Sequence, residues 1–358
     1  MPARGRPPMS REVARPVSAP RVRRLGDRRG ALPVAMVTIA IVAYVVWRHR
    51  DFGHQVVAGF ASLAPATLAG ALALVVVQVL CQGSRFWVLL RGDRGLTRLL
   101  VLHAFSVGEV FNALMPVRVG DAVKVMMLRR VHSSAESGLS RIVGALLADK
   151  VIDVATLLAL SVTALAIAGY GRLASERAAH DLRWLAAGVV IVVSLVVAIP
   201  FVVGRGPRAG RFASAWRFAR GVRVGFAALR EPRRTLYSAM FGIAGRLAEA
   251  TVIHVLCAAL GVSLGAAAIM LALALLNLGI AVPLSIANLG AYEAALAFGL
   301  TVWGVPLVSA IAIAIAHHLI ELVGIATTAG LVTVVRRWRA SRTELSVDLG
   351  SPRMNRDP

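Results

Sequence analysis

Long apolar stretches are the feature that most restricts how this chain can fold. A helix needs about 20 apolar residues to cross the hydrocarbon core of a membrane. Six stretches have this length or nearly so, and they are 31–47, 63–82, 142–170, 184–204, 236–260 and 306–335. With an apolar content of 58%, they exclude a soluble enzyme and predict an all-α integral membrane protein, a polytopic helix bundle.

Two further apolar regions, 99–128 and 265–304, are interrupted by residues that disfavour a continuous helix. In each region an asparagine is followed by a proline and then by a glycine. These residues are Asn112, Pro116 and Gly120 in the first region, and Asn277, Pro283 and Gly290 in the second. Broken backbone at membrane depth must be buried in protein or line a wet cavity. We therefore expect both regions to be re-entrant hairpins that contribute to a site.

The distribution of charge predicts the orientation of the chain. It has 40 Lys+Arg and 18 Asp+Glu, a formal net charge of +22. Five segments carry most of this charge, and they are 1–30 (+7), 83–98 (+3), 118–141 (+3), 205–235 (+8) and 336–358 (+3). All five lie on one side of the membrane if each interrupted region enters and leaves on the same side. The positive-inside rule makes that side, with both termini, cytoplasmic.

The order of span, hairpin and span occurs twice, in residues 63–170 and 236–335. The two copies start on opposite sides of the membrane, which predicts an inverted repeat. This architecture is typical of transporters whose site lies at the midplane between the repeats. The predicted organisation is a basic cytoplasmic leader, a transmembrane domain and a basic cytoplasmic tail, at 1–30, 31–335 and 336–358.

Segment 205–235 joins the two copies and has its own pattern. Its apolar residues recur every three or four positions, and arginines lie between them. This spacing predicts an amphipathic helix on the anionic inner leaflet. A solvated basic linker is the alternative.

Ionisable and polar residues inside the apolar regions are the candidates for function, because charge in lipid is costly. We assign them to a site for substrate binding and translocation. The candidates are Glu109, Asn112, Pro116, Arg118, Asp121, Lys124, Asp149, Lys150, Asp153, Arg246, Glu249, Pro283, Asn288, Glu293, His317 and Glu321. The two prolines would hold the hairpins open.

Several of these residues have a second interpretation. Asp149 and Asp153 are four residues apart and lie on one helix face. We expect them to be an unpaired carboxylate pair that faces a wet cavity. The alternative is a site for Mg²⁺-diphosphate, which such pairs bind in membrane prenyltransferases. Arg246 and Glu249 are three residues apart and could simply neutralise each other. His317 and Glu321 have the spacing of a metal pair, but no third ligand is evident. We expect no metal, no cofactor and no catalytic residue.

Three motifs resemble those of the lysylphosphatidylglycerol synthase transmembrane region, a flippase-like family. Residues 111–121 (FNALMPVRVGD) resemble its N-x-x-x-P-x-R-x-G-[DE] element, and 149–153 (DKVID) its E-R-x-x-D element. Residues 283–293 (PLSIANLGAYE) resemble its P-x-S-I-x-G-x-G-x-R-E element, with Asn288 in place of Gly and Tyr292 in place of Arg. A weaker Arg-Trp feature matches at 84–87, and the likeness covers about 35–335.

The resemblance implies a multi-pass protein of the bacterial inner membrane that moves a polar lipid between leaflets. The lipid would be aminoacylated, glycosylated or polyprenyl. The short basic tail implies the lipid-translocating part alone, without a soluble aminoacyltransferase domain, and hence no enzyme. Expected partners are membrane lipids and a separate lipid-modifying enzyme, with no nucleic acid.

Roles for individual residues follow from their charge. Arg118 and Lys124 would attract the lipid phosphate, and Asp149, Asp153 and Glu293 would accompany a cationic headgroup. Asn112 and Asn288 would supply neutral hydrogen bonds. Two other functions stay open: a membrane component of a lipid-linked glycosyl or acyl transferase, and a small-solute transporter.

Cysteine labelling tests the predicted orientation, in a background that lacks Cys81 and Cys257. In the variant Arg130→Cys, an impermeant maleimide is expected to react in inverted vesicles but not in sealed cells, because segment 118–141 is placed in the cytoplasm. Arg177→Cys, in the predicted external segment 171–183, is the control and should react in sealed cells. Labelling of position 130 from outside would contradict the orientation.

Overall fold

The structure, a computed structural model, describes residues 58, 61, 63–92, 95–115, 118–130, 135–168, 222–280 and 288–350. Every regular element in these residues is a helix. The helices are α3 (Pro65–Leu90), α4 (Arg98–Leu114), α5 (Val119–Arg129), α6 (Ala135–Ala168), η3 (Ala227–Arg230), α9 (Pro232–Ala259), α10 (Ala266–Gly279), α11 (Ala291–Thr301) and α12 (Leu307–Gly350). The prediction of an all-α protein is confirmed for this part of the chain.

Three described helices are long and apolar enough to cross a membrane: α3, α9 and the part of α12 from Leu307 to Arg342. They correspond to the predicted spans 63–82, 236–260 and 306–335. Residues 142–168 of the predicted span 142–170 belong to α6, whose 34 residues extend for about 51 Å. Predicted spans 31–47 and 184–204 and the leader 1–30 lie outside the described residues.

Helix α3 is longer than its apolar stretch. It begins with Pro65 in its first turn, where a missing N–H is tolerated. It continues beyond Gln82 to Leu90, so the first eight residues of segment 83–98 belong to the helix rather than to a connection. Arg85 is thereby carried into the protein interior, where it is 2% exposed.

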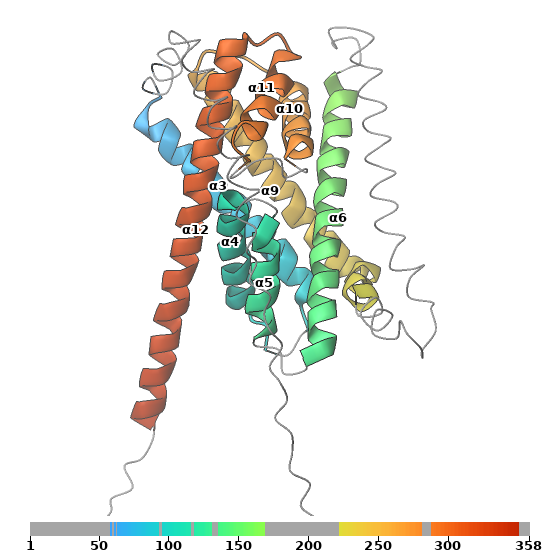
Figure 1. Cartoon of the computed structure of the whole chain (residues 1–358), viewed down its shortest axis with the longest axis vertical. Coiled ribbons are helices and arrows are strands. Elements are labelled where there is room, and N and C mark those ends of the chain that lie inside the picture. Colours follow the sequence, from blue (N-terminus) through green and yellow to red (C-terminus); the bar gives the residue numbers. More distant parts are fainter. Residues whose placement is uncertain are drawn as a thin grey trace, which may run out of the picture.

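The short helices form two pairs that lie in opposite halves of the molecule (Figure 1). Helix α4 packs on α5, and α10 packs on α11. The long helices α12 and α6 run along either side of these pairs, and α3 and α9 pack on each other between them (Figure 1). The open ends of the two pairs meet, since Arg118 at the start of α5 donates a hydrogen bond to the Ile280 carbonyl after α10, at 3.3 Å.

The polarity of the protein is reversed relative to a soluble domain. Leu236 and Phe298 are each 60% exposed, while Lys124 and Asp149 are completely buried. An exterior of this kind suits hydrocarbon rather than water. Apolar packing still fills part of the interior.

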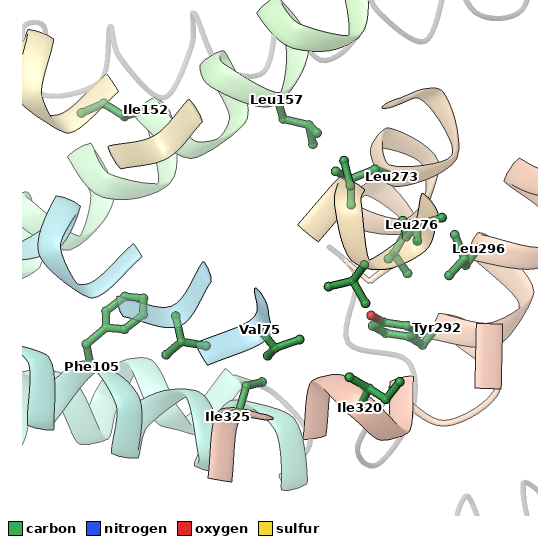
Figure 2. Packing of buried hydrophobic residues seen from close by; sticks show 14 of the residues in the cluster. Val75, Phe105, Ile152, Leu157, Leu273, Leu276, Tyr292, Leu296, Ile320 and Ile325 are labelled. Atoms are coloured by element: carbon green, nitrogen blue, oxygen red, sulfur yellow. The ribbon is translucent and has the colours of Figure 1, made fainter. Parts of the chain in front are cut away.

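Figure 2 shows one such apolar region, built by three helices. The side chains of Leu273, Leu276, Leu296 and Ile320 gather around the ring of Tyr292. They come from α10, α11 and α12. The tyrosine ring is thereby fixed next to polar groups that are described below.

Most of segment 205–235 lies outside the described residues. In the described end of the segment, Val222 and Phe226 of the predicted apolar face are buried. A Cβ atom on Gly144 of α6 would lie 2.3 Å from the Val222 carbonyl oxygen, so this end packs directly on the α6 backbone. In this described end, the apolar face of the segment packs on α6 rather than on the membrane surface.

Two glycines permit the close approach of α4 and α5. A Cβ atom added to Gly120 would lie 1.8 Å from the Gly108 carbonyl oxygen, and one added to Gly108 would lie 2.8 Å from the Gly120 carbonyl oxygen. Because the obstacle is backbone on both sides, a side chain cannot be accommodated by a rotamer change.

We expect Gly120→Ala to separate α4 from α5 and to destabilise the protein by about 1–3 kcal/mol. Thermal unfolding in detergent measures this as a lower midpoint. Gly330→Ala is the matched control, because a Cβ atom there meets nothing within 4 Å and alanine favours a helix. Equal midpoints for the two variants would contradict the close packing of the pair.

Candidate functional site

Arg85 of α3 is clamped between two carboxylates of α6. Its Nε donates to Asp149 Oδ1 at 2.7 Å, its Nη2 donates to Asp149 Oδ2 at 3.2 Å, and its Nη1 donates to Asp153 Oδ1 at 2.6 Å. The guanidinium and the Asp149 carboxylate are almost wholly buried, with side-chain exposures of 3% and 1%. The expectation that Asp149 and Asp153 form an unpaired pair is therefore wrong, because Arg85 lies between them.

A second guanidinium extends this network to α9 and α10. Arg246 donates to Asp153 Oδ2 at 2.6 Å, to Glu249 Oε2 at 2.5 Å and to Asn277 Oδ1 at 2.9 Å. The predicted pairing of Arg246 with Glu249 is present, but it is not self-contained, since Arg246 also binds Asp153 on another helix. Charges of opposite sign alternate along Asp149, Arg85, Asp153, Arg246 and Glu249, an arrangement that we call the ion chain.

Lys124 forms a separate cluster within the pair α4/α5. Its Nζ donates to Glu109 Oε1 at 2.5 Å and to Asp121 Oδ1 at 2.9 Å, and lies 4.4 Å from the centre of the Phe105 ring. Asn112 Nδ2 also donates to Asp121, at 3.2 Å. The Lys124 side chain has no exposed surface. Its ammonium is therefore buried and already bonded, and its expected role of attracting a phosphate stays a prediction.

A third cluster joins α11 to α12. Tyr292 Oη and His317 Nδ1 are 2.7 Å apart, and His318 Nδ1 is 2.6 Å from Glu293 Oε1. The Tyr292 ring stacks on the His318 ring, with 4.1 Å between centroids. Glu293 Oε2 also accepts a bond from the Gly290 N–H, which caps the start of α11.

Glu321 lies one turn beyond His317 but is bonded elsewhere. Its Oε1 accepts a hydrogen bond from Gln78 Nε2 of α3 at 2.9 Å. The His317 nitrogen and the Glu321 carboxylate thus have different partners. No group of three metal-ligating side chains is present in the described part of the chain.

These clusters surround one cavity of about 160 Å³, which is polar and large enough for several water molecules. Both short helix pairs and four long helices contribute to its wall. The lining side chains with polar or charged groups are Gln78, Gln82, Arg85, Glu109, Asn112, Arg118, Lys150, Asp153, Arg246, Glu249, Asn277, Asn288, Tyr292, His318 and Glu321.

Several buried polar atoms of this wall lack a hydrogen-bond partner in the described protein. They are Gln78 Oε1, Asn112 Oδ1, Arg246 Nε and Glu321 Oε2. Buried polar groups are normally satisfied by protein or water. Their concentration here indicates that the cavity holds water or a polar ligand.

Lys150 is the lining lysine, and its surroundings differ from those of Lys124. Glu109, Asp121 and Asp153 are close enough to interact with it electrostatically. Among the described residues, however, it has no hydrogen bond or ion pair of its own. Its ammonium is therefore available to a ligand in the cavity.

The structure brings most of the predicted site residues together. Nine of the sixteen line the cavity, and they are Glu109, Asn112, Arg118, Lys150, Asp153, Arg246, Glu249, Asn288 and Glu321. Five more bond directly to lining residues, and they are Asp121, Lys124, Asp149, Glu293 and His317. Pro116 and Pro283 lie outside the described residues.

Reasoning from the sequence missed three lining residues of importance, Arg85, Gln78 and Asn277. Arg85 was counted with a basic connection, although the Arg-Trp feature at 84–87 pointed to it. Gln78 is an isolated amide within an apolar stretch, and this was the signal that could have found it. Asn277 was noted only as an interruption of an apolar region.

The two helix pairs place corresponding residues at corresponding points. Asn112 and Asn277 are each the third residue from the end of the first helix, and Asp121 and Glu293 are each the third residue of the second. Arg118 and Asn288, the described non-glycine residues with positive φ (48° and 54°), both precede the second helix. On the following long helices, Asp149, Lys150 and Asp153 share the spacing of His317, His318 and Glu321.

Apolar helices around a cavity lined by charged and polar groups define a polytopic membrane protein with an internal polar site. The family model for the lysylphosphatidylglycerol synthase TM region matches residues 34–329. The chain belongs to this family. No curated protein sequence matches it.

The ion chain makes Arg85 a sensitive position. We expect Arg85→Met to destabilise the protein by about 3–5 kcal/mol, because it leaves Asp149 buried without a cation. Adding Asp149→Asn should recover part of this loss, since the unpaired charge is removed. Unfolding in detergent measures both variants, and equal stability of Arg85→Met and the unmodified protein would contradict the clamp.

Proposed function

We propose that the protein moves a polar lipid from one leaflet of the membrane to the other. The observation that carries this proposal is the charged cavity enclosed by helices whose outer surface is apolar. A headgroup crossing the bilayer needs polar partners at membrane depth, while its acyl chains stay in lipid. Membership of a family named for the membrane region of a lipid synthase agrees with a role in lipid metabolism.

The two short helix pairs are, in this proposal, re-entrant hairpins of an inverted repeat. Helices α4 and α5 have 17 and 11 residues, about 26 and 17 Å long, and are shorter than a hydrocarbon core of about 30 Å. The corresponding asparagines, acidic residues and left-handed backbone positions in both pairs support the repeat. Strongly basic connections lie on one side of the membrane and weakly charged connections on the other, and this supports opposite orientations of the two copies.

Lys150 is the proposed partner of the lipid phosphate, in place of Lys124. It lines the cavity and has no direct partner among the described residues. Arg118, which is exposed and stands where the two pairs meet, would receive the phosphate first. The carboxylates of the ion chain are already neutralised by guanidinium groups, so they shape the cavity rather than accompany a cation.

Leaflet exchange in reconstituted vesicles tests the function. The purified protein is expected to accelerate exchange of labelled lipid in a panel of aminoacylated, glycosylated and polyprenyl lipids. Failure with every lipid of the panel would contradict the proposal. Uptake of a soluble solute without any lipid dependence would instead favour a solute transporter.

Lys150→Met is expected to slow exchange by about 10- to 100-fold, because a bond to a charged group contributes about 1.5–3 kcal/mol. Arg129→Met is the matched control, since Arg129 is an exposed cation at the end of α5 and does not line the cavity. Retention of full exchange by Lys150→Met would remove Lys150 from the lipid path.

A further inference from the structure

Asp153 is the last residue of the Asp149, Lys150, Asp153 pattern on α6, and Glu321 is the last residue of the equally spaced pattern on α12. The surroundings of these two acids differ. Two guanidinium groups contact Asp153, those of Arg85 and Arg246, each at 2.6 Å. Glu321 has a neutral partner, the Gln78 amide at 2.9 Å. Among the described residues, no cation lies within ion-pair distance of its carboxylate. Glu321 is therefore an acid at membrane depth without a fixed counter-charge.

The hydrogen bonds around Glu321 are incomplete in a way that a proton would correct. Glu321 Oε2 and Gln78 Oε1 are both buried and both lack a partner. While Glu321 is ionised, its Oε2 atom can only accept, as the Gln78 amide oxygen always does, so neither oxygen can satisfy the other. A proton on the carboxyl group converts one acceptor to a donor and also removes the cost of burying an unpaired charge.

The charges near Glu321 do not supply the missing counter-ion. Arg246 interacts electrostatically with it, but the bonds of Arg246 are made to Asp153, Glu249 and Asn277. Glu249 and Glu109 repel a negative charge at Glu321. The titratable and charged groups that line the same cavity or bond to its wall are Arg85, Glu109, Arg118, Asp121, Lys124, Asp149, Lys150, Asp153, Arg246, Glu249, Tyr292, Glu293, His317 and His318.

We propose that Glu321 binds and releases one proton through the cavity, and that this proton moves in step with the lipid. The proton comes from water in the cavity and returns to it, so no other reactant is required. Asp153, held by two guanidinium groups, keeps a fixed charge in the other half. The coupling rests on the proposed lipid movement, whereas the proton site itself does not.

Infrared difference spectroscopy tests the proton site without any lipid movement. As the pH is raised, the unmodified protein is expected to lose the carbonyl band of a neutral carboxylic acid, and Glu321→Gln is expected to lack this change. Glu231→Gln is the matched control, because Glu231 is exposed and lies at the start of α9. A protein without a titrating acid band, or an unchanged band in Glu321→Gln, would overturn the proposal.

Leaflet exchange of a fluorescent aminoacylated phosphatidylglycerol, measured in vesicles at different pH, tests the coupling. In the pH range where proton binding to Glu321 limits lipid exchange, the exchange rate is expected to change by about tenfold per pH unit, since one proton is involved. Glu321→Gln should make the rate independent of pH, while Glu321→Asp should restore the dependence with a shifted midpoint. The same pH profile in Glu321→Gln and the unmodified protein would refute the coupling. A protein that titrates in the infrared but moves no lipid would refute the proposed function and leave the proton site standing.

Discussion

The alternating charges of the ion chain are the interaction on which the arrangement of the long helices depends. Arg85 and Arg246 come from α3 and α9, and the carboxylate of Asp153 on α6 is shared between them. A buried ion pair adds little to stability compared with apolar packing, but it penalises every arrangement that leaves one charge unpaired. The ion chain therefore fixes which faces of α3, α6 and α9 meet, and so places the wall of the cavity.

The cavity follows from a second constraint, the shortness of the paired helices. The helix pairs α4/α5 and α10/α11 end within the molecule (Figure 1). Polar residues at these ends, Asn112, Arg118, Asn277 and Asn288, line the cavity there. The backbone contact of Gly108 with Gly120 keeps the first pair narrow. Polar atoms left without protein partners then line the space between the pairs, and this explains why the cavity is polar while the exterior is apolar.

The sequence was sufficient to predict the helical membrane class, the long apolar helices of the described part of the chain and most of the residues that surround the cavity. Apolar length and intramembrane charge are local signals, and each can be identified within one stretch. The partners of those charges could not be predicted in this way. Arg85 and Asp149 are 64 residues apart, and the burial of Lys124 depends on how α4 packs on α5. Ion pairs between helices decide whether a charged side chain is available to a ligand. Patterns in the sequence do not show which helices pack together, so they do not predict these ion pairs.

Helix α3 connects the two halves around the cavity in unequal ways. Gln78 and Arg85 are seven residues apart, about two helical turns, and therefore lie on one face. Arg85 makes charge-assisted bonds to α6, whereas Gln78, a neutral amide, makes one bond to Glu321 of α12. Charge-assisted bonds are about twice as strong as neutral ones. In the proposed proton exchange, the bond between α3 and α12 is neutral while Glu321 carries the proton and charge-assisted after its release. The bonds between Arg85 and α6 keep their charges throughout. Protonation of Glu321 therefore acts on the contact of α3 with α12.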